Sequence, residues 1–532
     1  MFRRLHSTRS VLVATLLAAV VTAQAPTEPI RVLLRARDGG ADRLTPLRYV
    51  GGFETKTLLY ETLVRRGDDG RIAPGLASRW WWDESQTTCL FELRAGATFH
   101  DGTPVTAEAV RVHFQRWVGL PEHDWLAVNR RITGVTTSGD RIVRVHLDAP
   151  YALLDDLCAI NPCAIVGPGA RDWEGEFQRP VGTGPFRFAA ALDGGVRWRL
   201  ERAAPGGPVL EVAFLPRGRD RTPIDALRAG TVDVFVGGWD EDLPADALAE
   251  LAADPRFVIQ EAPGSSVAYV SFRLDEGPTA DPVIRRRIQA AVDRAELVAT
   301  VEGGRADATT TWAARSVASW PSSNATATPL AAVAAPGLPA LRLAAGPQGS
   351  RIARIAEVLQ GQLQRAGFAV ELVRRTATSP QPASTTGDAV GTVRPLDAES
   401  GATRRQRNRE ERAVADTCDL RIQTTHGVPY DPHQALVARF GPVPAKNADQ
   451  PRPRGGIDPR LQALVGLSMA TVDEIARAPI YAEIQALIDR EALIVPLYAP
   501  RRLALRRVDV DGIVLPIDVY RVDLTGVHRT TR

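Results

Sequence analysis

The sequence predicts an α/β protein built from two or three domains. With 532 residues, the chain is longer than one ordinary hydrophobic core organises. Strand and helix patterns alternate along it, and the clearest unit is LRLAA, SRIARIAEVLQGQLQRAG and FAVELV within residues 341–373. Such a strand–helix–strand order predicts a parallel βαβ unit. The apolar face of its helix is expected to consist of Ile352, Ile355, Leu359 and Leu363.

The first half of the chain shows the same alternation. CLFELRA at 89–95 and DRIVRVHLD at 140–148 alternate apolar and polar side chains, which predicts two strands. Between them, TAEAVRVHFQRWV at 106–118 predicts a helix that Thr106 caps.

In the second half, VAYVSFRL at 267–274 and IVPLYA at 494–499 predict strands. The stretch DPVIRRRIQAAVDRAELVATVEGG, which starts at Asp281, predicts a helical region, and a further helix is expected near 479–490. Residues 376–403 are rich in Pro, Ser, Thr and Gly and nearly lack large apolar side chains. We expect an exposed, disordered loop there.

The N-terminus has the features of a secretory signal peptide. A basic start precedes the thirteen-residue apolar run VLVATLLAAVVTA, which is too short to span a membrane comfortably. Small residues at its end predict cleavage after Ala23, so residues 1–23 are the expected signal peptide. No cysteine follows the run, so we expect no lipid anchor. The mature protein is expected to be soluble and periplasmic or otherwise exported.

The charge balance argues against nucleic acid as a partner. Removal of residues 1–23 leaves 62 basic and 62 acidic side chains. No basic run is interleaved with aromatic residues, as a phosphate-binding surface would require. The basic residues are arginines except for Lys56 and Lys446, a bias that we attribute to genome composition.

Four cysteines, at 89, 158, 163 and 418, fit no zinc spacing. In an exported protein, Cys158 and Cys163 of CAINPC either close a small disulfide or remain two buried thiols. The sequence leaves both alternatives open.

The stretch THGVPYDPH at 425–433 contains two histidines, a tyrosine and an aspartate within nine residues. A metal site, another pocket wall and a plain turn all fit this composition. The residue before a proline is restricted to extended conformations, so we expect Asp431 and Pro432 to set a turn. His433 is expected to be a structural partner of that turn.

Six stretches together resemble the family 5 extracellular solute-binding proteins, the receptors of ABC importers for peptides and nickel. They are YETLV (60–64), PGLASRW (74–80), FELRAGATFHDGTPVTAEAV (91–110), PVGTGPF (180–186), LRAGTVDVFVG (227–237) and VIRRRIQAAVDR (283–294). The resemblance implies a large two-lobed periplasmic binding protein type II fold, cluster C-like, with an extra subdomain in the first lobe.

The implied division places lobe I at 24–262, with an inserted subdomain at about 60–180, lobe II at 263–496, and a return to lobe I at 497–532. The resemblance also implies the function. Such a receptor, expected to be a monomer, captures a small molecule, metal or peptide between closing lobes and delivers it to a membrane permease.

Within the family, HDWL at 123–126 and GVPYDPH at 427–433 look most like the nickel-binding branch. Trp125 and Tyr430 match a tryptophan and the tyrosine with which that branch contacts its metal chelate. Other contact positions of the branch fall on different residues here: its methionine near Phe53, its arginine at Asn161, its second tryptophan at His426 and its histidine near Pro444. The implied ligand-binding residues are therefore Phe53, Trp125, Asn161, His426 and Tyr430.

The departures from that branch bear on the ligand. Asn161 lacks the charged fork with which arginine binds a carboxylate, and Glu122, in place of a nearby arginine, would repel one. His426 can instead coordinate a metal, or hydrogen-bond a neutral or cationic ligand, through its imidazole. The first expected cargo is nickel or a metal chelate. No resident cofactor is expected.

An oligopeptide or related solute is the alternative cargo. Peptide-binding relatives usually carry an aspartate where this chain has Val428, so a peptide's ammonium would lack its usual partner. An exported hydrolase is a third hypothesis, but the chain has no GxSxG, HExxH or phosphate-loop motif. We expect His100 and Asp101 of FHDG to form a turn and not to catalyse a reaction.

Overall fold

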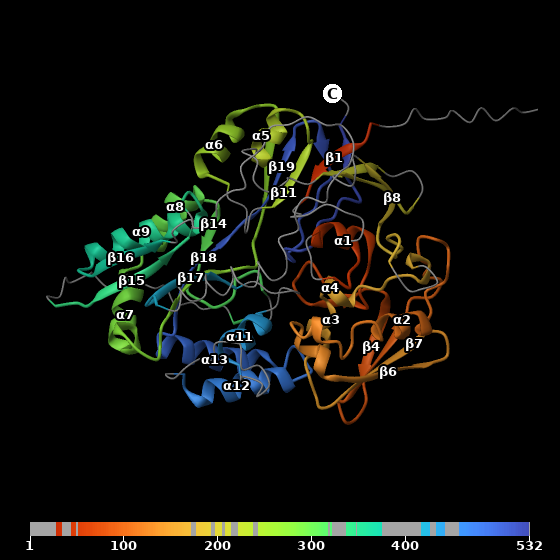
Figure 1. The fold of residues 1–532 in the computed structure, drawn as a ribbon, viewed down its shortest axis with the longest axis horizontal. Coiled ribbons are helices and arrows are strands. Elements are labelled where there is room, and N and C mark those ends of the chain that lie inside the picture. Colours follow the sequence, from red (N-terminus) through yellow and green to blue (C-terminus); the bar gives the residue numbers. More distant parts are fainter. Residues whose placement is uncertain are drawn as a thin grey trace, which may run out of the picture.

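The computed structural model describes residues 28–34, 44–48, 52–171, 177–192, 197–204, 208–213, 222–237, 243–317, 320–321, 337–346, 348–374, 417–425, 432–441 and 457–530, with no side-chain description at 432–434. These residues form two lobes, each built on its own β-sheet, and a small domain beside the first (Figure 1). The expected signal peptide, the loop at 376–403, His426, Tyr430 and Pro444 lie outside the described residues.

Seven of the described strands form the sheet of the first lobe, in the order β12-β19-β11-β1-β10-β9-β8. Their bounds are β1 Ile30–Leu33, β8 Phe186–Leu192, β9 Arg197–Arg202, β10 Val209–Ala213, β11 Val234–Gly237, β12 Phe257–Ala262 and β19 Arg502–Arg507. β1 is parallel to both of its neighbours, whereas β19 is antiparallel to β11 and β12. Helices α5 (Pro223–Arg228) and α6 (Ala245–Ala253) belong to this lobe, and β20 (Val510–Asp511) pairs with β21 (His528–Arg529) near its end.

The small domain is an antiparallel sheet in the order β4-β5-β7-β6, with helix α2 against β6 and β7. Its elements are β4 Ala77–Trp82, β5 Thr88–Leu93, β6 Ile132–Ser138, β7 Ile142–Leu147 and α2 Ala107–Phe114. Five short elements connect it to the first lobe: α1 Phe53–Leu59, the pair β2 Val64–Arg66 and β3 Ile72–Pro74, α3 Leu153–Leu157 and α4 Ile160–Cys163. We count them and the small domain with the first lobe.

The second lobe contains a six-stranded sheet in the order β14-β18-β13-β17-β15-β16 among the described strands. The strands are β13 Ala268–Phe272, β14 Ala306–Ala308, β15 Ala340–Ala345, β16 Ala369–Arg374, β17 Leu420–Thr424 and β18 Ile494–Pro500. Its helices are α7 Pro282–Ala291, α8 Arg294–Glu302, α9 Arg351–Arg365, α11 Pro432–Phe440, α12 Pro459–Ala470 and α13 Ala478–Arg490.

The parallel βαβ unit predicted at 341–373 is present as β15, α9 and β16. One residue of its predicted apolar face is wrong: Ile352 is 42% exposed. Ile352 is the second residue of α9, at the end of the helix where fewer neighbours cover it, whereas Ile355, Leu359 and Leu363 are buried as predicted.

Two predicted helix starts are confirmed by their side-chain caps. The hydroxyl of Thr106 accepts a hydrogen bond from the Ala109 amide, and the carboxylate of Asp281 accepts one from the Val283 amide. The helical region after Asp281 consists of two helices, because α7 ends at Ala291, Val292 is extended and Asp293 caps α8.

In the part of the chain that the structure describes, two segments pass between the two sheets. One crossing joins β12 to β13 and the other joins β18 to β19. The crossings touch: a Cβ added to Gly264 in the first would lie 1.7 Å from the carbonyl oxygen of Pro500 in the second. Only a glycine allows this approach, so the lobes are connected through two adjacent segments.

Among the described residues, no helix combines the length and the apolar composition that crossing a membrane requires.

Candidate functional site

Two of the predicted ligand residues, Phe53 and Asn161, meet at a third residue, Lys56. Phe53 begins α1, and Lys56 follows one turn later on the same face. The Lys56 ammonium donates to the side-chain oxygen of Asn161 over 3.0 Å and to the carbonyl of Arg48 over 3.1 Å. It lies 5.9 Å from the centre of the Phe53 ring. Lys56 and Asn161 are both buried.

An aromatic side chain from the C-terminal part of the chain completes this cluster. The rings of Phe53 and Tyr520 are 5.2 Å apart and tilted by 55°. Tyr520 is held by its neighbour Asp518, whose carboxylate accepts from the Tyr520 amide. The cluster of Phe53, Lys56, Asn161 and Tyr520 thus combines a lysine, an amide and two aromatic rings.

Lys56 is the member that our sequence reasoning missed. Considered alone, Asn161 indicated that this position carries no cation, but the structure places an amine directly beside it. Burial lowers the pKa of Lys56 from 10.5 to about 7. The sequence did contain one signal for Lys56: it is one of only two lysines, with Lys446, in a chain whose other basic residues are arginines. A lysine in such a chain suggests that the position requires an amine and not a guanidinium.

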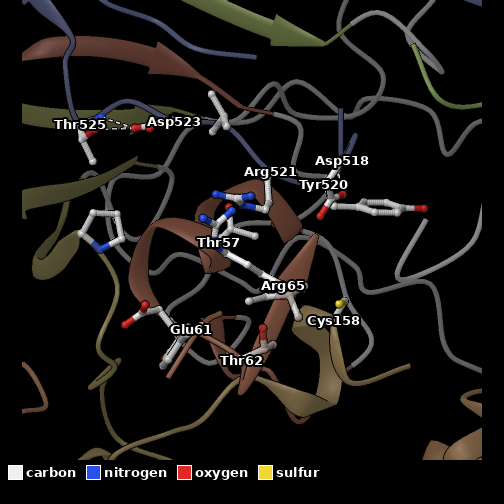
Figure 2. A pocket seen from close by; sticks show the side chains of 15 residues that line it. Thr57, Glu61, Thr62, Arg65, Cys158, Asp518, Tyr520, Arg521, Asp523 and Thr525 are labelled. Carbon is white, nitrogen blue, oxygen red and sulfur yellow. Dashed lines mark hydrogen bonds between the residues drawn. The ribbon is translucent and has the colours of Figure 1, made fainter. Parts of the chain in front are cut away.

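A pocket of about 210 Å³ adjoins the cluster and shares Tyr520 with it (Figure 2). Its lining comes from the first lobe only: Thr57, Tyr60, Glu61, Thr62, Arg65, Gly75, Cys158, Ile160, Pro185, Asp518, Tyr520, Arg521, Val522, Asp523 and Thr525. Two arginines point toward its middle in Figure 2. Arg65 donates to the carbonyl of Pro74, and Arg521 donates to the carbonyl of Arg66.

The other predicted site residues lie elsewhere. Trp125 is 37% exposed in the small domain, between two short 3₁₀ turns at 121–123 and 127–130. The role of Trp125 as a ligand contact stays a prediction. His426 and Tyr430 lie outside the described residues and also stay predictions.

The PVGTGPF and FHDG stretches form one structural contact. A Cβ on Gly182 would lie 2.1 Å from the carbonyl oxygen of Leu59, at the end of α1. His100 donates through Nε2 to the Gly184 carbonyl over 2.9 Å, and its Nδ1 accepts from the Gly182 amide over 3.3 Å. Asp101 accepts from the amide and hydroxyl of Thr103. Both predicted turn residues therefore have structural partners.

The cysteines of CAINPC are buried thiols in this structure. Cys158 donates to the carbonyl of Leu154, and Cys163 donates to that of Asp156. Burial raises the pKa of the Cys163 thiol well above its ordinary value. Of the two alternatives drawn from the sequence, the structure has the thiols.

The described residues contain no group of three or more His, Cys, Asp or Glu side chains arranged to hold a metal ion. The tentative metal ligand His426 is not among those residues.

Comparison with known proteins identifies the family. The model of the bacterial extracellular solute-binding proteins, family 5 (middle region), matches residues 71–447. The chain belongs to this family. The resemblance drawn from the six sequence stretches is confirmed, and so is the two-lobed α/β fold.

Two curated relatives and one solved structure illustrate the range of the family. The chain is 24% identical over 474 residues to the nickel-binding periplasmic protein of Escherichia coli strain K12, covering 83% of this chain and 84% of that one. It is 25% identical over 490 residues to the probable di/tripeptide-binding protein 5 of Pseudomonas aeruginosa strain UCBPP-PA14, with the same coverage. The crystal structure of NikA from Brucella suis in complex with Fe(III)-EDTA matches with a TM-score of 0.72 at 20% identity, covering 94% of this chain and all of that one.

This family 5 protein is therefore a substrate-binding protein of the ABC importer type. Proteins of the family bind small ligands or peptides and work with membrane permeases.

Proposed function

We propose that this family 5 protein captures a small solute between its two lobes, closes on it and delivers it to a membrane permease of an ABC importer. Lobe I is proposed at 24–262 and 497–532, and lobe II at 263–496. Closure follows from differential affinity, because a ligand that touches both lobes stabilises the closed form. The two adjacent crossings at Gly264 and Pro500 support a hinge between the lobes.

The proposed cargo is nickel or another metal, carried as a chelate with carboxylate groups. The observation that carries this choice is the Lys56 amine beside Asn161. In its protonated form this amine has the charge that Asn161 lacks, so an anionic chelate that favours the protonated form regains a partner at this position. His426 is the proposed metal contact, with Phe53, Trp125 and Tyr430 as proposed walls of the site.

A peptide is the second candidate, favoured by the likeness to the di/tripeptide-binding relative. A free peptide offers an ammonium as well as a carboxylate. The Lys56 amine suits the carboxylate and would repel the ammonium.

Thermal unfolding of the mature chain tests these alternatives. We expect nickel with L-histidine to raise the melting temperature, because a ligand that binds only the folded chain stabilises it. Nickel with histamine, which has no carboxylate, should raise it less, and Lys56→Met should remove the difference. A melting temperature that peptides raise and nickel, with or without histidine, leaves unchanged would refute the metal proposal.

We propose no enzymatic activity. Turnover of any member of a broad panel of ester, peptide and phosphate substrates by the purified chain would contradict this.

A further inference from the structure

Four charged side chains join the two lobes at one place. Asp155, in α3 of the first lobe, is bound by two guanidinium groups, that of Arg66 at the end of β2 and that of Arg477 in the second lobe. Arg66 also binds Glu474, with 3.0 Å between Nη1 and Oε1. Glu474 and Arg477 both lie in the connection from α12 to α13.

Most of this cluster is closed off from water. The side chains of Asp155 and Arg477 are each 2% exposed and that of Arg66 is 6% exposed, whereas Glu474 at 21% forms the rim. Ion pairs in such a place are screened little by salt and depend on their partners staying together. Removal of one partner while the lobes are together would leave a buried charge uncompensated, which costs more than the loss of a surface ion pair.

The cluster divides into two halves without leaving an unbalanced charge. Arg66 and Asp155 belong to the first lobe, and Glu474 and Arg477 belong to the second. Separation of the lobes breaks the bond from Asp155 to Arg477 and the bond from Arg66 to Glu474. Of these four side chains, each lobe then keeps one cation and one anion. This arrangement suits a contact that forms and breaks repeatedly.

Neighbouring contacts cross the same boundary. The amide of Ala152 donates to the carbonyl of Met469 over 2.8 Å, and the amide of Ile72 donates to the Glu474 carboxylate over 3.4 Å. In Figure 1, α3 and α12 lie in the lower half of the view, away from β11 and β19 in the upper half. A rotation about the two chain crossings next to β19 would move this boundary far more than the crossings themselves.

We propose that Arg66, Asp155, Glu474 and Arg477 form a reversible lock between the lobes, made on closure and broken on opening. This inference rests on the proposed function, since it assumes lobes that open and close. The lock adds to the stability of the closed form and so raises the affinity for any ligand that this form encloses.

The test measures the distance between the lobes by spin labels. Leu120→Cys in the small domain and Val283→Cys in α7 provide exposed labelling sites, while the four native cysteines are buried. In the ligand-free labelled chain we expect two distance populations, one short and one long. Arg477→Gln should lower the ratio of closed to open chains by about tenfold or more.

Two further variants separate the lock from general effects of charge removal. Glu474→Gln removes the other cross-lobe pair from a partly exposed position and should shift the populations in the same direction. Arg460→Gln is the matched control, because Arg460 pairs with Glu483 between α12 and α13, inside the second lobe and on its surface. It should leave the populations unchanged.

A short-distance population that is absent from the unsubstituted labelled chain, or that persists unchanged in Arg477→Gln and Glu474→Gln, overturns the lock. Titration with nickel–histidine and with trialanine decides the proposed function separately. If neither ligand binds but the substitutions still shift the distances, the lock is supported and the proposed cargo is refuted.

Discussion

At the scale of single residues, the sequence predicted which positions matter more successfully than it predicted the role of each side chain. Asn161 was predicted from resemblance to face a ligand, and the structure places it against Lys56. The consequence of that pairing was not visible from the sequence, because the two residues are 105 positions apart and neither forms a motif with the other. Local patterns reveal residue types, whereas a buried charge depends on its three-dimensional neighbours.

The pH dependence of stability should reveal the buried amine of Lys56. Below pH 7 the amine is charged in both the folded and the unfolded chain, so the fold bears the full free-energy cost of burying a charge. Between about 7 and 10.5 the folded chain releases the proton while the unfolded chain keeps it, so the free energy of unfolding rises with pH.

In Lys56→Met this rise should be smaller by up to about 1.4 kcal/mol per pH unit. Urea unfolding of both chains at pH 7, 8 and 9 measures the difference. Parallel curves would show that the amine is not shielded from water.

At the scale of elements, local signals were sufficient for helix starts and for the βαβ unit. Thr106 and Asp281 cap the helices that their positions predicted. Failures occurred where tertiary packing decides, as for Ile352, which has the correct spacing but is exposed in the first turn of its helix. The PVGTGPF stretch is a similar case. Its glycines are needed because α1 packs closely against them, and this contact could not be predicted from the sequence pattern.

The contact between α1 and this loop predicts a large effect of one methyl group. In Gly184→Ala the new Cβ would lie 2.5 Å from the carbonyl oxygen of Leu58, so the loop or the helix must move. We expect a loss of about 2 kcal/mol or more in the free energy of unfolding. Gly134→Ala is the matched control, because its Cβ meets nothing within 4 Å. Urea unfolding should separate the two variants, and equal stabilities would contradict the proposed packing.

At the scale of the whole molecule, the family resemblance predicted the two lobes, but the sequence pattern alone could not give the strand order. β19 lies between β11 and β12 although about 240 residues separate it from β12 along the chain. Periodicity identifies a strand but carries no information about such a distant neighbour.

This position of β19 predicts how truncation at the C-terminus changes the protection of the first lobe from proteolysis. Removal of residues 502–532 takes away a strand that pairs on both sides, so the first lobe should lose its protection from proteolysis. Removal of 528–532 takes away β21, which pairs with β20 alone, and the ion pairs of Arg529 with Asp233 and Asp509. It removes no strand of the seven-stranded sheet, so it should leave the first lobe protected. Limited trypsin digestion followed by mass spectrometry compares the two, and similar fragments from both would contradict the prediction.

The position of β19 between β11 and β12 also has a consequence for biogenesis. Ribosomes make β1, β10, β11 and β12 hundreds of residues before β19, so the place between β11 and β12 in the sheet of the first lobe stays open until synthesis is almost complete. A chain that cannot finish folding early remains extended for longer, which is the state in which a secretory protein crosses a membrane. If residues 1–23 act as the proposed signal peptide, the order of the strands itself would delay folding until after export.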